Sequence, residues 1–156
     1  MVLEKLQNLE FKNIMQEHIY SVLEFLFTQN QEFGVACEIE YVGFNPPLPS
    51  DIQETLPSIT LFMLANYTFE SAVVRDDILS FEAGFGAENF GSVVTIPLLS
   101  IKQIFVGEYP ILINIAEPIT KEEKELEIES EVDSMSILLN NPENAKLFKN
   151  RGKKDI

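Results

Sequence analysis

The segment that decides the fold of this chain reads Leu79-Ser80-Phe81-Glu82-Ala83-Gly84-Phe85-Gly86-Ala87. Apolar side chains occupy the odd positions from 79 to 85, and small or polar residues occupy the even ones. This alternation is typical of a strand with one buried and one exposed face. The run at 86–91 is rich in glycine and asparagine and predicts a turn. A further strand is expected at 93–96, where Pro97 stops it.

Working outward, the flanking segments add more short strands. Residues 58–69 form a long apolar run that predicts a buried strand, and 71–75 predicts a second strand before an acidic turn at Asp76-Asp77. Residues 35–41 and 111–115 also suit strands. Three prolines in residues 46–49 exclude a central strand or helix there, so 43–49 is expected to be an extended loop or sheet edge.

One helix is expected before these strands, at residues 11–27. Seven apolar side chains recur there at steps of three and four, which places them on one stripe: Phe11, Ile14, Met15, Ile19, Val22, Leu23 and Leu26. Phe25 and Phe27 fall off the stripe and need a second surface, either a dimer interface or a deep core position. One helix with five or six short strands predicts an α+β, mainly β fold, a small and strongly bent sheet or barrel.

Charge and composition narrow the classes of function. The formal net charge is −14, which disfavours binding to nucleic acid or to an anionic membrane surface. No apolar run has the ~20 residues that a membrane span needs, and the first ten residues do not resemble a secretory signal. Cys37 is the single cysteine, so a reducing, cytoplasmic location is expected.

The charges predict three parts of the chain. Residues 1–117 are expected to form the folded domain, 118–143 a flexible acidic linker that could instead be a charged helix, and 144–156 a short basic docking tail. About 25 flexible residues would span roughly 25–30 Å. The tail combines an apolar pair with basic residues: Leu147, Phe148, Arg151, Lys153 and Lys154.

Residues that would indicate catalysis are sparse. His18 lies inside the predicted helix, and Cys37 in a predicted strand is typical of a small core residue. The acid pairs Glu38/Glu40 and Asp76/Asp77 fit a solvated strand face and a turn. No metal-ligand spacing, phosphate-binding glycine motif or nucleophile elbow is present in the sequence. We therefore expect a binding protein without catalysis, metal or other cofactor.

Four stretches carry a resemblance to a known family: the helix at 14–27, the proline-containing segment at 45–56, the strand at 59–66, and 79–87 followed by 93–98 with an aromatic residue near 105. In this order they resemble the stringent starvation protein B family (SspB), the adaptors that deliver ssrA-tagged proteins to the ClpXP protease. The likeness covers about two-thirds of the chain. The acidic linker and basic tail also match the layout of that family.

The resemblance implies a small Sm-like barrel that forms a homodimer through its N-terminal helix. It further implies a groove for C-terminal degradation-tag peptides and a tail that docks on a ClpX-type unfoldase. The groove would be walled by Phe62, Met63, Leu64, Ala65, Asn66, Ala83, Gly84, Phe85, Gly86 and Ala87. A bulky side chain at Ala83 would fill it, because small residues let an extended backbone approach closely.

Two departures from the family pattern carry expectations of their own. The second glycine of the family motif is Ala87 here, which would be strained if that position needs a positive φ. The acidic body would repel acidic peptides, so the tag is expected to be neutral or basic.

Two other readings remain open from the residues. A hot-dog-like acyl-binding protein would show an enclosed apolar tunnel with a carboxylate beside it. A plain interaction or chaperone module would show no peptide groove.

Overall fold

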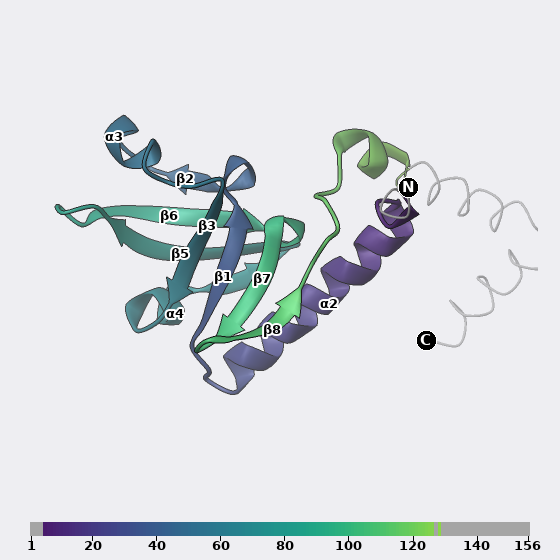
Figure 1. Ribbon diagram of the computed structural model, residues 1–156, viewed down its shortest axis with the longest axis horizontal. Coiled ribbons are helices and arrows are strands. Elements are labelled where there is room, and N and C mark those ends of the chain that lie inside the picture. Colours follow the sequence, from purple (N-terminus) through teal and green to yellow (C-terminus); the bar gives the residue numbers. More distant parts are fainter. Residues whose placement is uncertain (1–4, 127, 129–156) are drawn as a thin grey trace, which may run out of the picture. The chain divides into compact units, whose positions relative to one another are not determined.

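Two four-stranded antiparallel sheets and one long helix build the chain up to Pro118 in this computed structural model, which describes residues 5–126 and 128 (Figure 1). The first sheet has the order β3-β1-β7-β8: Ile59–Leu64, Phe33–Glu38, Ile101–Val106 and Tyr109–Ile113. The second has the order β2-β6-β5-β4: Gly43–Asn45, Phe90–Pro97, Ile78–Phe85 and Val73–Arg75. The predicted α+β class is confirmed, and the two sheets do not close into one barrel.

The alternating segment behaves as its pattern predicts. In β5, Leu79 and Phe81 are buried while Ile78, Glu82 and Gly84 are exposed. The strand pairs with β6 along its whole length, from Ile78 opposite Pro97 to Phe85 opposite Phe90. The predicted acidic turn joins β4 to β5: Asp76 and Asp77 both have positive φ, as a two-residue hairpin turn of type I′ requires.

A cluster of phenylalanines joins the two sheets at their inner faces. Phe62 from β3 lies 5.8 Å from Phe81 of β5 and 6.4 Å from Phe44 of β2, measured between ring centroids. Phe44 also meets Phe85 edge-on at 5.6 Å. Edge-to-face contacts of this kind add to the free energy gained by burying the rings. They fix β5, and with it the outer face of the second sheet.

Helix α2 (Leu9–Thr28) confirms the predicted helix and buries Ile19, Leu23 and Leu26. Asn8 caps its first turn by accepting a hydrogen bond from the backbone N–H of Phe11. Ile14 departs from the predicted stripe, because 56% of its surface is exposed.

The two off-stripe phenylalanines of α2 have different surroundings. Phe27 packs against Phe33 and Phe69 of its own chain, at ring-centroid distances of 5.5 and 5.6 Å. Phe25 instead leaves 61% of its surface exposed. The core of the chain therefore covers Phe27. The described part of the chain does not provide a surface that covers Phe25.

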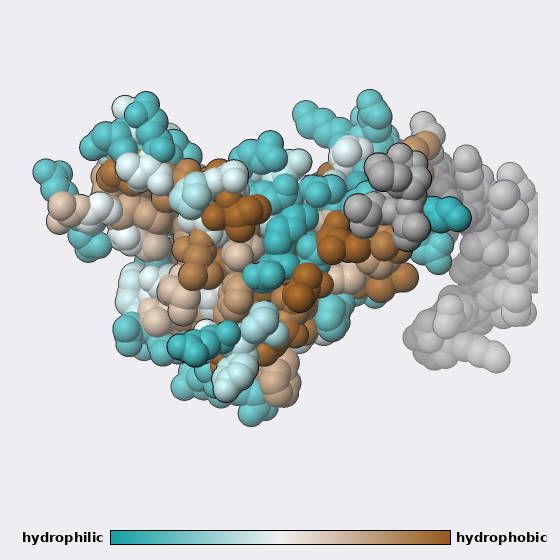
Figure 2. All heavy atoms as spheres, viewed as in Figure 1, coloured by the Kyte–Doolittle hydropathy of each residue, from teal (hydrophilic) through white to brown (hydrophobic). Residues whose placement is uncertain are grey.

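The apolar run at 58–69 is shorter and less buried than its composition predicts. Strand β3 ends at Leu64, Asn66 has a positive φ, and helix α4 (Tyr67–Ser71) follows. Only one face of β3 is covered by the described chain, and Ile59, Leu61 and Met63 on its other face are about half exposed (49%, 54% and 55%). Figure 2 is viewed with the first sheet in front, and apolar side chains are visible on this face of the molecule.

Other predicted bounds shift by a few residues. Strand β1 ends at Glu38, where a 3-10 turn at Ile39–Tyr41 replaces the rest of the predicted strand. The proline-rich segment forms the edge strand β2, a cis Asn45-Pro46 bond and the short helix α3 (Ser50–Gln53). A second 3-10 turn, Leu98–Ser100, precedes β7.

After Pro118 the chain enters a separate unit. Residues 121–126 are helical, so this part of the predicted linker takes the helical alternative. Thr120 and Glu123 cap its start reciprocally: each side chain accepts a hydrogen bond from the other's backbone N–H, at 3.1 and 3.3 Å. The predicted docking tail at 144–156 lies outside the described residues. Within the described part, no helix is both long and apolar enough to cross a membrane.

Candidate functional site

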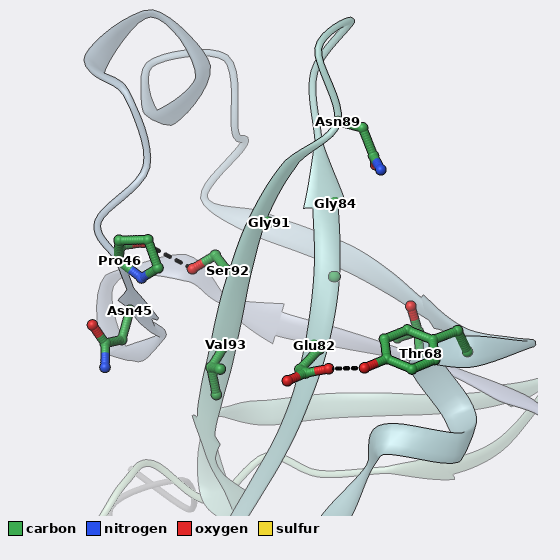
Figure 3. Close-up of a pocket in the computed structure, with 11 residues that line it drawn as sticks. Asn45, Pro46, Thr68, Glu82, Gly84, Asn89, Gly91, Ser92 and Val93 are labelled. Atoms are coloured by element: carbon green, nitrogen blue, oxygen red, sulfur yellow. Dashed lines mark hydrogen bonds between the residues drawn. The ribbon is translucent and has the colours of Figure 1, made fainter.

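A hollow of about 470 Å³ opens on the outer side of the second sheet, where β5 and β6 run toward their turn (Figure 3). Its volume falls within the roughly 300–1,000 Å³ typical of ligand sites. It is lined by Asn45, Pro46, Tyr67, Thr68, Glu82, Ala83, Gly84, Asn89, Gly91, Ser92 and Val93.

Two opposed glycines make room for this hollow. Gly84 of β5 pairs with Gly91 of β6, so neither strand places a side chain on the outer face at this point. A Cβ atom added at Gly91 would meet no atom within 4 Å, whereas one added at Gly84 would lie 1.7 Å from Oδ1 of Asn89. The space over Gly91 is therefore open, and the Asn89 side chain lies against Gly84.

The edge of β5 is open beside the hollow. Strand β4 pairs with β5 only as far as Val73 opposite Ser80. The next backbone N–H on that edge, at Glu82, donates to Oγ of Ser71 at 2.9 Å. Backbone groups two residues apart on a strand point the same way, so the N–H and C=O of Gly84 also face away from β6. No strand of the described chain pairs with this edge at Gly84, which is exposed.

Tyr67 and Glu82 form the wall on this open side. The hydroxyl of Tyr67, at the start of α4, donates a hydrogen bond to Oε2 of Glu82 (Figure 3). This hydrogen bond and the negative charge of Glu82 raise the pKa of the Tyr67 phenol. Because an ionised carboxylate has about four acceptor positions, Glu82 keeps capacity for a further donor.

A second hollow of about 420 Å³ adjoins the first. The two share Tyr67, Glu82 and Val93. The second also includes Glu70 and Ser71 of α4 and Ser80 of β5. The two adjoining hollows are together called the channel beside β5.

Of the residues predicted to wall a groove, only two line the first hollow. Gly84 contributes its floor, and Ala83 lines it as a half-buried residue of the β5 face that carries Phe81. Phe62 and Leu64 lie in the core, whereas the side chain of Met63 lies beside Gly34 on the outer face of the other sheet. The others lie between β3 and α4 or at the end of the β5–β6 hairpin: Ala65, Asn66, Phe85, Gly86 and Ala87. Their contact with a peptide stays a prediction.

The turn at 86–89 accommodates Ala87 without a positive φ. The left-handed positions are Gly86, at φ 73°, and Asn89, at φ 53°. Asparagine tolerates this conformation better than most residues. The strain that a positive φ would cause at Ala87 is therefore absent.

The sequence patterns do not predict most of the residues that line the first hollow. Asn89 and Gly91 belong to the run that the sequence marks as a turn, and a glycine at a strand position is a known sign of close backbone approach. The remaining missed residues come from β2 and the proline after it, α4, β5 and β6, and the tertiary fold brings these elements together: Asn45, Pro46, Tyr67, Thr68, Glu82, Ser92 and Val93.

The two residues considered for nucleophilic chemistry lie in different environments. Cys37 is fully buried, and burial raises the pKa of its thiol, so the thiol is protonated at neutral pH. His18 is exposed on α2. Cys37 thus has the surroundings of a core residue.

A polar cluster at the end of β8 has a structural role. Lys102 forms an ion pair with Glu38 at 2.9 Å and donates to the carbonyl of Ala116 at 2.7 Å. Buried Asn114 donates to the carbonyls of Leu99, Ile101 and Ala116. Partial burial raises the pKa of Glu117, against the opposing effect of Lys102. These contacts hold the segment that follows β8 against the first sheet.

No protein-family model matches this chain. No curated protein matches it either.

Proposed function

We propose that this protein is a proteolysis adaptor without catalytic activity, which binds a C-terminal degradation tag and presents the tagged protein to an AAA+ unfoldase of the ClpX type. The resemblance to the SspB family motivates the proposal, and the open edge of β5 beside the glycine-floored hollow is the observation that supports it. The mechanism needs only two binding contacts on one chain.

An exposed strand edge favours an extended peptide as its ligand. Peptides add to such edges through main-chain hydrogen bonds, while neighbouring pockets select side chains. The N–H and C=O of Gly84 supply one pair of backbone contacts, and the open space over Gly91 leaves room for a side chain of the peptide. A small-molecule site of the hot-dog type would instead need an enclosed tunnel, and this hollow lies on the outer face of its sheet.

Tethering would then supply the activity. A substrate held on the domain and an unfoldase held by the tail at 144–156 are joined by one chain, which raises the effective concentration of the substrate at the unfoldase. No bond has to be broken by the adaptor itself.

We extend the proposal to a homodimer that pairs through α2. Ile14 and Phe25 are exposed and lie eleven residues apart, three helical turns, so they share one side of the helix. Light scattering of the full chain at micromolar concentration should give twice the 17.7 kDa chain mass. A monomer at these concentrations would contradict this pairing.

Deletion of residues 144–156 separates the two contacts. The truncated chain should bind a tag peptide as tightly as the full chain, because the hollow lies in a different part of the chain. Degradation of a tagged reporter by the unfoldase–protease should fall to its adaptor-free rate. A matched variant keeps the length of the tail and replaces its five basic residues with glutamine. Degradation that persists at full rate after deletion of the tail would contradict the proposal that the tail docks on the unfoldase.

A further inference from the structure

We propose that the channel beside β5 selects peptides that carry a cationic side chain, Lys or Arg, opposite Glu82. This inference rests on the proposed peptide-binding function and specifies its substrate class. The observation that carries it is the position of an oriented carboxylate on the outer face of β5, two residues from the open edge at Gly84.

The charges around the channel have one sign. Among the described residues that line the two hollows, the charged side chains are Glu82 and Glu70, and neither hollow is lined by Lys or Arg. Glu82 belongs to both hollows, and Glu70 comes from α4 on the open side. The net charge of the whole chain is also strongly negative, at −14. A peptide that enters the channel therefore meets a negative potential at short and long range.

Glu82 is positioned to form an ion pair with a cationic side chain of a peptide, and not only to repel acidic peptides. Its carboxylate is held by the hydroxyl of Tyr67, which reduces the freedom that an ion pair would have to restrict. Glu82 and Gly84 point to the same face of β5, about 7 Å apart along the strand. A peptide strand added at Gly84 would bring one of its own side chains diagonal to Glu82, where opposite charges attract and like charges repel.

The test measures binding of three labelled octapeptides to the full chain by fluorescence anisotropy. Each has an alanine background and a free C-terminus, with three consecutive Lys, Gln or Glu residues at its centre, so that the charges occupy both faces of an extended strand. A favourable and an unfavourable cross-strand charge pair each change affinity by up to about fivefold. We expect the Lys peptide to bind about tenfold more tightly than the Glu peptide at 50 mM salt, and this ratio to shrink at 500 mM salt.

Two variants separate recognition by Glu82 from the general negative field. Glu82→Gln keeps an acceptor for Tyr67 and should remove most of the preference for Lys. Glu88→Gln makes the same charge change in the exposed turn, outside both hollows, and should retain it. Equal affinity for the three peptides, or an equal loss of preference in both variants, would overturn the inference while leaving peptide binding intact. Failure of every peptide to bind would overturn the proposed function itself.

Discussion

Gly91→Val is expected to weaken binding of a tag peptide while the protein stays folded. The added side chain enters open space, since a Cβ at Gly91 meets no atom within 4 Å, and it fills the floor of the hollow. A side chain of a peptide paired with the edge of β5 can then no longer enter the hollow. We expect the dissociation constant to rise at least about tenfold, or ~1.4 kcal/mol. Thermal unfolding should be unchanged or slightly shifted upward, because valine suits a strand better than glycine by up to ~1 kcal/mol.

Thr95→Val is the matched control for Gly91→Val. Thr95 lies on the same face of the same strand, opposite Ser80 and outside the first hollow. This variant should bind the peptide as the unmodified chain does. Undiminished affinity in Gly91→Val, with the control unchanged, would show that no part of the peptide enters the hollow over Gly91.

Phe81→Ala should produce the largest loss of stability. Phe81 is 2% exposed, packs on Phe62 from the facing sheet, and lies in β5 directly before Glu82. Truncation of a buried phenylalanine costs about 3–5 kcal/mol, through lost burial and the cavity that remains. Since a domain of this size is stable by only about 5–15 kcal/mol, the urea unfolding midpoint should drop markedly.

Tyr109→Ala provides the comparison for Phe81→Ala. It removes an aromatic ring that is 77% exposed, so its unfolding midpoint should change little. A similar loss of stability in the two variants would contradict the role of the phenylalanine cluster in joining the sheets.

The local patterns of apolar residues predict those helices and strands that have one buried face and one exposed face. The alternation in β5 works because one face meets the phenylalanine cluster and the other meets solvent. The helix pattern works for Ile19, Leu23 and Leu26, and it misplaces Ile14, which is 56% exposed although Phe11 and Met15 beside it are half-buried. The run at 58–69 misleads because apolar residues on an edge strand can remain exposed, as Leu61 does.

The candidate site is harder to predict than the fold. Gly84 is predicted from the alternating segment, whereas the sequence pattern assigns Gly91 to the turn, since β6 begins at Phe90, three residues before the predicted strand. Tyr67 could not be placed, because its position depends on the break at Asn66 and on α4 packing beside β5. The open edge of β5 depends on where β4 ends, and strand pairing of this kind is set by the tertiary fold rather than by the local pattern.

Amide hydrogen exchange at Gly84, with and without a saturating peptide, tests the central claim most directly. The claim is that the backbone of β5 beyond Glu82, at Gly84, pairs with an extended peptide. The exchange rate of the Gly84 amide should fall at least about tenfold on binding, while the Ala83 amide, which already faces β6, should change little. A bound peptide that leaves Gly84 exchange unchanged would contradict strand pairing at this edge.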